Sequence, residues 1–499
     1  MTHQRGAAFL LLVVTLVLGA AAVFYSRVRS STAEAEKDRA TTSALQQAKA
    51  ALIGNAVAVT LTATPASTVR PGDFPCPDTN DSGSAGASCN TQATRVGRLP
   101  WKTLGLPDLR DGDGERLWYA VSTNFKNNTR TLCTAGAPEA TTCLNSDTRG
   151  TITIRDTAGQ LVHDAFNTDP ASSGVIAVVF SAGAVLQRQG AAAAQDRSCT
   201  VGVNCTAAGL CTGSPTTNTP KCNPVNYLDV VSGVDDNADF IDGNSANGFI
   251  KGIVRDASGN VIVNDRLMLV TYQDLMPQLE KRVTAEVSKC LVTYANANFR
   301  RYPWPAPVTT IATPFSGGIN TVFGRVPDAP LWTSRFGNVT VAEPPASMSA
   351  LDTALAAACT APPGLCMNIS WPITGCVLPK DPAASSWWNN WKLQVFYSVA
   401  DAYKPQFVYT QTSATTVSLG TIALPAGCPA CLTVSPPSLA ADKQIVVITA
   451  SRTLAGQSRA SPANRQSAAN YLEGENNNSD TVFTKQSGST TFNDMVFYK

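Results

Sequence analysis

Histidine, the usual general base of hydrolytic enzymes, occurs only twice in this chain of 499 residues. His3 lies at the very start, and His163 follows Gln160-Leu161-Val162 with no GxSxG nucleophile motif nearby. A Ser/His/Asp arrangement needs a histidine next to an activated serine. We therefore predict no catalytic residues and do not expect the chain to be an enzyme.

Acidic residues gather in three loops that also contain Gly or Asn: 78–83, 106–115 and 235–243. Calcium prefers several oxygen ligands in flexible loops of this kind. None of the loops completes an EF-hand, because Cys89 stands where the first would need its terminal Glu. Tight turns use the same residue types, so turn formation is the alternative. Calcium is the one cofactor we consider, with the third loop as its best site through Asp235, Asp236, Asp239 and Asp242.

The 14 cysteines predict disulfides in an oxidising compartment, since they are even in number and many lie close in sequence. Cys428 and Cys431 have CxxC spacing, but no second CxxC follows, which disfavours a zinc or thioredoxin-type centre. Cys290 is left over and could bridge to Cys376. The disulfide candidates are Cys76 with Cys89, Cys133 with Cys143, Cys359 with Cys366, and the pair Cys428 and Cys431.

A group of three tryptophans, Trp387, Trp388 and Trp391, lies in the sequence SSWWNNWK just before an expected strand. Such clusters can stack on sugars or bind partner proteins. The alternative is that the rings belong to the protein core. We consider both.

The N-terminal part of the chain contains an uncharged apolar run over 7–25. This run is about as long as the ~20 residues that cross a bilayer and longer than the apolar part of most secretory signals. It predicts a retained transmembrane helix, with a signal peptide cut near residues 20–22 or a plain membrane anchor as alternatives. Arg5 precedes the run while Arg27 and Arg29 follow it, so charge alone does not orient the span.

The short basic leader ending in Gly6, followed by this helix and an Ala-rich segment, resembles the N-terminus of type IV pilins and type II secretion pseudopilins. The resemblance implies that a prepilin peptidase cuts between Gly6 and Ala7. Most pilins have Glu at the fifth position after the cut, whereas this chain has Leu11. Certain minor pseudopilins placed at filament tips also lack that carboxylate. The resemblance further implies filament contacts through Phe9, Leu10, Leu11 and Val14.

Five sequence landmarks occur twice in the same order, which predicts a tandem duplication. They are a helical segment (44–58 and 274–298), an aromatic-Pro turn (74–77 and 302–305), a Gly-Arg-x-Pro motif (97–100 and 324–327), strand pairs (117–121 with 176–183, and 395–399 with 445–450) and an Asn-Asp motif (264–267 and 493–496). Strands are expected at 117–121, 151–155, 176–180, 267–271, 393–399, 407–411, 445–449 and 495–498.

These elements predict an α+β, pilin-like fold in which a long N-terminal transmembrane helix packs on an antiparallel sheet, within a tandemly duplicated module. The second helix carries apolar residues at spacings of three and four, with Asp274 as its N-cap. The expected segments are a leader over 1–6, a helix over 7–60 with its transmembrane half at 7–25, a first module over 61–272 with a disulfide-rich insertion at about 196–226, and a second module over 273–499 with an insertion at about 328–390.

Charged residues make up 15% of the chain and the net charge is +2, so no basic patch indicates nucleic acid. The expected function is that of a minor pilin or pseudopilin at the tip of a type IV pilus or secretion pseudopilus, with an adhesive surface. Its expected partners are other pilins, the prepilin peptidase and the inner membrane. The protein would lie in the inner membrane as a single-pass protein with a periplasmic bulk and then reach a pilus or the cell surface. The alternative is an anchored or secreted surface-binding protein outside any filament.

Overall fold

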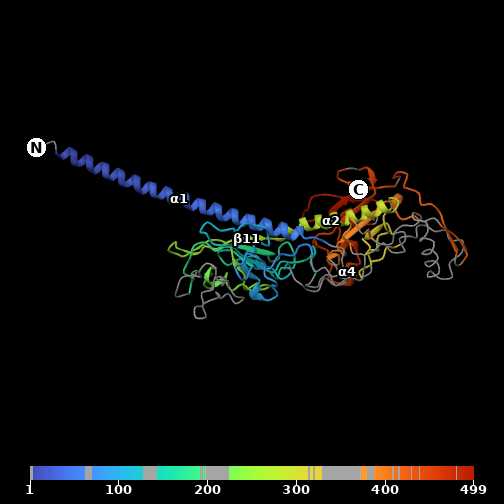
Figure 1. The fold of residues 1–499 in the computed structure, drawn as a ribbon, viewed down its shortest axis with the longest axis horizontal. Coiled ribbons are helices and arrows are strands. Elements are labelled where there is room, and N and C mark those ends of the chain that lie inside the picture. The colour runs from blue at the N-terminus through green and yellow to red at the C-terminus, as the bar shows by residue number, and fades with distance from the viewer. Residues whose placement is uncertain are drawn as a thin grey trace.

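The computed structural model describes residues 4–61, 70–126, 143–190, 195, 197, 224–312, 315–318, 321–328, 371–372, 374–378, 387–406, 409–413, 416–428, 430–437, 439–478 and 480–499, and the side chains of all of these except 4–10, 22–31, 409–413 and 416–419. Two long helices lie along one side of the body, and the longer one runs far beyond it toward the N-terminus (Figure 1). They are α1 (Gln4–Ala58) and α2 (Tyr272–Ala297).

Each half of the chain builds a four-stranded antiparallel sheet with the same topology. In both sheets the short strand after the aromatic-Pro turn lies at one edge and the last strand of the half lies at the other. The first has the order β1 (Val96–Arg98), β2 (Trp118–Val121), β5 (Ala177–Ser181), β11 (Arg266–Val270), and the second the order β12 (Phe323–Arg325), β13 (Val395–Val399), β18 (Ile445–Thr449), β20 (Met495–Tyr498).

A smaller three-stranded sheet accompanies each large one, and both contain one antiparallel and one parallel pairing. They have the orders β4 (Leu161–His163), β3 (Ile154–Arg155), β8 (Phe249–Ile250) and β17 (Ala441–Lys443), β16 (Leu432–Ser435), β19 (Val482–Thr484). The remaining strands form two-stranded ribbons, namely β6 (Val230–Val231) with β7 (Asp235–Asp236), β9 (Val254–Arg255) with β10 (Val261–Val263), and β14 (Tyr409–Ser413) with β15 (Thr416–Leu419).

The short helices are α4 (Pro462–Arg465) and single 3₁₀ turns at Gln92–Thr94, Pro224–Asn226, Trp387–Asn390, Asp401–Tyr403, Ala468–Asn470 and Gly474–Asn477. The helix α2 begins one turn earlier than expected. Thr271 is its N-cap, and Asp274 is the third helical residue, whose carboxylate accepts from the Thr271 backbone N–H at 2.8 Å. This reciprocal arrangement is a capping box, which satisfies two amides that the helix itself cannot pair.

One continuous hydrophobic core joins α1, α2 and both large sheets. Small and medium side chains of α1 are buried in it: Ala44, Leu45, Ala48, Leu52 and Ala56. A second core fills the other face of the first sheet around Trp118, Phe180 and Phe249. Because both halves contribute to the same core, separating them would expose apolar surface of each.

The predicted fold is wrong in its transmembrane helix. In the part of the chain that the structure describes, no helix is both long enough and apolar enough to cross a membrane. The expectation came from the apolar run over 7–25 alone. That run is one part of the single helix α1, which also carries charged residues between Glu34 and Arg39. The predicted single-pass location in the inner membrane is overturned by the same finding.

Candidate functional site

The N-terminal part of α1 exposes a group of large apolar side chains. Leu11, Leu16 and Leu18 are 65%, 67% and 63% exposed, although a leucine is normally favoured by burial. Leu12, Val13, Val14 and Val17 are exposed as well. Residues 4–10, which include Gly6, Ala7, Phe9 and Leu10, are helical, and their side chains lie outside the described ones. We call residues 11–18 the apolar stretch.

Polar contacts fix the middle of α1 to the first half of the body. Lys37 Nζ lies 2.6 Å from Asp113 Oδ1, and the Gly112 backbone N–H donates to Thr41 Oγ1 at 2.9 Å. Asp38 pairs with Arg266 of β11 at 2.5 Å. Exposed pairs of this kind contribute little stability each, but together they define where α1 leaves the body.

Gly112 approaches the backbone of Lys37 so closely that a Cβ there would overlap it. We expect Gly112→Ala to push this part of α1 away and to destabilise its docking by about 1–3 kcal/mol. Trypsin cleavage after Lys37 and Arg39 should then become several-fold faster. Gly54→Ala is the matched control, since Gly54 lies on α1 with open space around its Cα. Equal cleavage rates for the two variants would contradict the close contact.

Buried and half-buried polar side chains form a cluster with equivalent contacts in each half of the chain. The first polar cluster comprises Gln195, Arg197, Tyr227, Asp229, Asn237, Asn264 and Asp265. The second polar cluster comprises Gln457, Arg459, Tyr471, Glu473, Asn476, Asn493 and Asp494.

A buried aspartate lies at the centre of the first polar cluster. Asp265 Oδ2 accepts from the backbone N–H of Asp229 and from Asn237 Nδ2, both at 2.8 Å. The Asp229 carboxylate accepts in turn from Gln195 Nε2 at 2.9 Å and from the Asn264 backbone N–H at 2.8 Å. The two carboxyl groups are therefore held within one hydrogen-bond network.

The second polar cluster repeats these contacts. Asp494 Oδ2 accepts from the Glu473 backbone N–H at 3.1 Å and from Asn476 Nδ2 at 2.9 Å. The Glu473 carboxylate accepts from Gln457 Nε2 at 2.8 Å and from the Asn493 backbone N–H at 3.0 Å. The first and second polar clusters therefore make the same hydrogen bonds, with equivalent carboxylates as acceptors and equivalent amide and backbone N–H groups as donors.

A buried arginine stacks on an aromatic ring in each half. Arg98 lies 4.3 Å from the ring centre of Trp118 and 4.1 Å from that of Tyr227. Arg325 lies 4.7 Å from the ring of Tyr471. These two arginines come from the repeated Gly-Arg-x-Pro motif, which therefore positions a cation against an aromatic residue of each polar cluster.

Burial favours the protonated form of the paired acids. It raises the pKa of Asp265, and the charge of Asp229 raises that pKa further. Burial also raises the pKa of Asp229 to about 6. The pKa of Asp494 is raised by burial and by Glu473 in the same way. Each cluster can therefore retain a proton under conditions in which an exposed carboxyl group loses it.

Sequence reasoning missed most of the polar cluster residues. A usable signal was present in Asn226-Tyr227-Leu228-Asp229, which is repeated as Asn470-Tyr471-Leu472-Glu473. The short motif Gln195-Asp196-Arg197 is likewise repeated as Gln457-Ser458-Arg459.

The predicted calcium residues all have protein partners. Asp235 also accepts from the Gly248 backbone N–H, as loop carboxylates commonly do. The ion pairs and hydrogen bonds are Asp235 with Arg155, Asp236 with Arg188, Asp239 with Asn247, and Asp242 with Arg95. Among the described residues, no three His, Cys, Asp or Glu side chains are grouped so that they could hold a metal ion. Calcium at this loop stays a prediction.

His163 lies on the edge strand β4, where its Nδ1 is 3.2 Å from the backbone oxygen of Ser173. Burial lowers the pKa of this histidine. No serine hydroxyl is bonded to it among the described residues.

The tryptophans that were considered for binding are core residues. Trp387, Trp388 and Trp391 are all 0% exposed. The first two rings pack edge to face with their centres 5.7 Å apart, and Trp387 Nε1 donates to the Val377 backbone oxygen at 3.0 Å. A ring covered on all sides is not available to stack on a sugar, so an exposed binding surface built from these residues is wrong.

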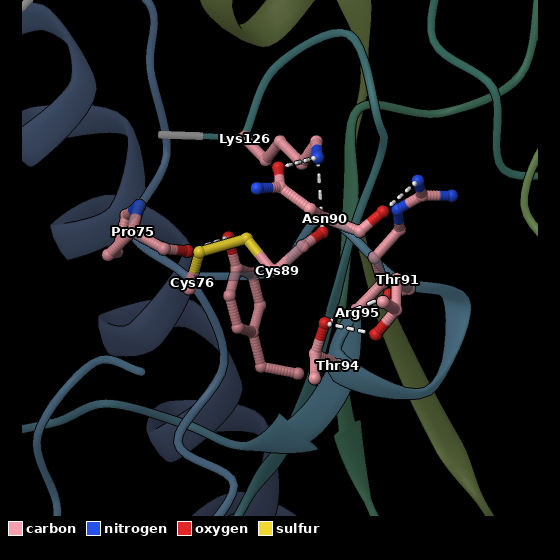
Figure 2. Close-up of a disulfide and its surroundings, with 9 residues drawn as sticks. Pro75, Cys76, Cys89, Asn90, Thr91, Thr94, Arg95 and Lys126 are labelled. Atoms are coloured by element: carbon pink, nitrogen blue, oxygen red, sulfur yellow. Dashed lines mark hydrogen bonds between the residues drawn. A yellow bond between two sulfur atoms is a disulfide. The ribbon is translucent and has the colours of Figure 1, made fainter. Parts of the chain in front are cut away.

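The disulfide between Cys76 and Cys89 joins the aromatic-Pro turn to the loop that precedes β1. Figure 2 shows Lys126 beside it, with its Nζ donating to Asn90 Oδ1 at 2.6 Å and to the Cys89 backbone oxygen at 3.2 Å. The buried Lys126 amine thus ties the chain that follows β2 to the disulfide loop.

Two further disulfides are present, Cys290 with Cys376 and Cys428 with Cys431. Cys290 lies on α2, so its disulfide attaches the chain near Val377 to that helix. Cys143 is also disulfide-bonded. The candidates Cys133, Cys359 and Cys366 lie outside the described residues, as does most of the predicted disulfide-rich insertion at about 196–226.

Comparison of the chain with models of known protein families, with curated proteins and with solved structures found no match.

Proposed function

We propose that this protein is a structural subunit of the type IV pilin or type II secretion pseudopilin kind, of the minor type, that assembles with other subunits through α1. The observation that carries the proposal is the apolar stretch of α1. It projects from the body and exposes seven large apolar side chains. A helix with such a surface is stabilised by packing against other helices.

The tip of a filament is the position that suits this chain. Leu11 supplies no carboxylate at the fifth position after the proposed cut, so it cannot pair with the N-terminal amine of a neighbouring subunit. The body of two fused halves is also bulky, and a terminal position demands the fewest contacts with neighbours. The proposal contains no catalytic step and no nucleic acid.

The direct test is N-terminal mass spectrometry of the protein recovered from cells that contain or lack the prepilin peptidase. We expect a mature chain that begins at Ala7 only when the peptidase is present. Gly6→Leu should block this cut and serves as the processing control. A start near Val23, or an unprocessed Met1 in both strains, would remove the support for a pilin-type role and favour a secreted surface-binding protein.

The second test asks whether the apolar stretch makes the subunit contacts. Leu12→Ser together with Leu16→Ser should abolish co-purification with other pilin-like subunits. Leu161→Ser is the matched control, because Leu161 is also a large exposed apolar residue (49%) but lies on β4 of the body. Equal co-purification of both variants would show that α1 does not mediate assembly.

A further inference from the structure

A cleft of about 370 Å³ lies where the two halves of the chain meet. Small-molecule sites commonly enclose ~300–1,000 Å³. Both halves contribute to its lining, which contains no Leu, Ile, Val, Met, Phe or Trp among the described residues. Asn124, Asp147, Arg149 and Thr168 line it from the first half, and Thr453 and Arg459 from the second.

The floor of the cleft is held by an ion pair between the buried Arg459 and the half-buried Asp147. Arg459 Nη1 donates to both oxygens of Asp147, at 2.8 and 2.9 Å, and to Gln394 Oε1 at 2.9 Å. The Arg459 guanidinium also lies over the ring of Tyr471, 4.4 Å from its centre. These contacts fix the floor from both halves and neutralise the charges of Asp147 and Arg459 against each other.

The rim carries polar groups with unused hydrogen-bonding capacity. Arg149 is exposed, and one of its five N–H groups donates to the Asn167 backbone oxygen at 3.2 Å. The hydroxyl groups of Thr168 and Thr453 have no hydrogen-bond partner within the described residues. Asn124 uses its Nδ2 on the Arg149 backbone oxygen at 2.9 Å, which leaves its Oδ1 as an acceptor.

The chemistry of the lining selects the class of ligand. Two arginines against one aspartate give the cleft a formal charge of +1, which favours an anion over a cation. The absence of large apolar side chains disfavours a lipid or an aromatic ligand. Threonine hydroxyls and an amide oxygen match the hydroxyl groups of a sugar, and an exposed guanidinium matches a carboxylate in a bidentate geometry.

We propose that this cleft binds a carboxylated saccharide, with Arg149 holding the carboxylate and Asn124, Thr168 and Thr453 holding ring hydroxyls. The site uses residues of the body alone, so the proposal is independent of assembly through α1. Neither half forms the cleft by itself, so binding at this junction requires the two halves to keep their fixed arrangement.

The test is isothermal titration calorimetry of the full chain with glucuronate, glucose, glucosamine and acetate as separate probes. Glucuronate should bind, and Arg149→Ala should weaken its binding by about 10-fold or more, as expected for a lost charged hydrogen bond. Arg255→Ala is the matched control, because Arg255 is exposed and donates to one backbone oxygen just as Arg149 does.

Several outcomes would overturn the proposal. They are the absence of glucuronate binding at millimolar concentrations, equal affinity of wild type and Arg149→Ala, and an equal loss in Arg255→Ala. Glucose or glucosamine binding as tightly as glucuronate would contradict carboxylate recognition, and acetate binding as tightly would contradict recognition of the sugar. Thr453→Val is a second variant on the other half of the cleft, and it should weaken glucuronate without affecting acetate.

Discussion

Replacing Arg325 by methionine is expected to lower the free energy of unfolding by about 3–5 kcal/mol. Arg325 is 0% exposed and donates to the backbone oxygens of Leu393 and Arg465, the latter at 2.7 Å. Its guanidinium also lies 4.6 Å from the ring of Phe396 and 4.7 Å from that of Tyr471. Methionine fills much of the same volume but leaves these buried carbonyl groups without donors.

The expected loss in the free energy of unfolding of Arg325→Met is a balance of two opposing effects. Burial of the charge is itself unfavourable, and it lowers the pKa of Arg325 to about 10. Removing the charge therefore recovers part of the loss. The unsatisfied carbonyl groups still dominate, since each costs about 1–3 kcal/mol when it is buried without a partner.

Urea unfolding followed by tryptophan fluorescence measures the effect, because several tryptophans lie in the core that Arg325 supports. Arg255→Met is the control, since the exposed Arg255 donates to one backbone oxygen at 3.0 Å. We expect that change to stay within about 0.5 kcal/mol. A loss of less than 1 kcal/mol in Arg325→Met would mean that the stacked arginine is not a major support of the second half.

Local sequence patterns were sufficient for six of the eight strands of the two large sheets, but they did not predict the short edge strands β1 and β12. The predicted strands at 445–449 and 495–498 coincide with β18 and β20, because their β-branched and aromatic residues suit a pleated, buried surface. The repeated landmarks are accounted for by the shared strand order of the two sheets. These features depend on near neighbours in the chain, so sequence reasoning reaches them.

Features that depend on distant segments were not predictable in the same way. The sequence left open whether the three tryptophans of 387–391 form a binding surface or belong to the core, and the structure buries all three in the core shared by both halves. Nothing in the local sequence marks Glu280 of α2 as buried, yet it bonds to Ser451 and Tyr272 inside the fold. The acids over 235–242 looked like ligands because the arginines that pair with three of them, Asp235, Asp236 and Asp242, lie far away in sequence. In each case a tertiary contact decided the role of the residue.

The protein is expected to become less stable as the pH rises from about 4.5 to about 7, and Glu280 should account for a large share of this loss. Glu280 is 3% exposed, and its Oε1 accepts from Ser451 Oγ at 2.7 Å. Burial raises its pKa from 4.5 to about 7, although hydrogen bonds from Ser451 and the charge of Arg459 act in the opposite direction.

The sign follows from proton linkage. Between pH 4.5 and 7 the folded protein keeps a proton on Glu280 that the unfolded chain has released. The folded state binds more protons, so the free energy of unfolding falls as the pH rises. The stability that depends on protonated Glu280 is fully present below about pH 4.5 and is lost above about pH 7. A shift of this size corresponds to about 3 kcal/mol. Asp73 and Asp229, whose pKa values burial raises to about 6, add to the same trend.

Urea unfolding of the disulfide-intact chain at pH 5 and at pH 8 tests this expectation. Glu280→Gln keeps the shape and the acceptor oxygen but does not titrate, so it should be at least as stable as wild type at pH 8 and should show a smaller difference between the two pH values. Glu286→Gln is the matched control on α2 and should retain the full wild-type difference. If Glu280→Gln has the same pH dependence as wild type, the buried carboxyl group does not hold its proton in the folded state. If Glu280→Gln is much less stable than wild type at both pH values, the hydrogen bonds of Glu280 stabilise the fold by more than its buried carboxyl group destabilises it at pH 8.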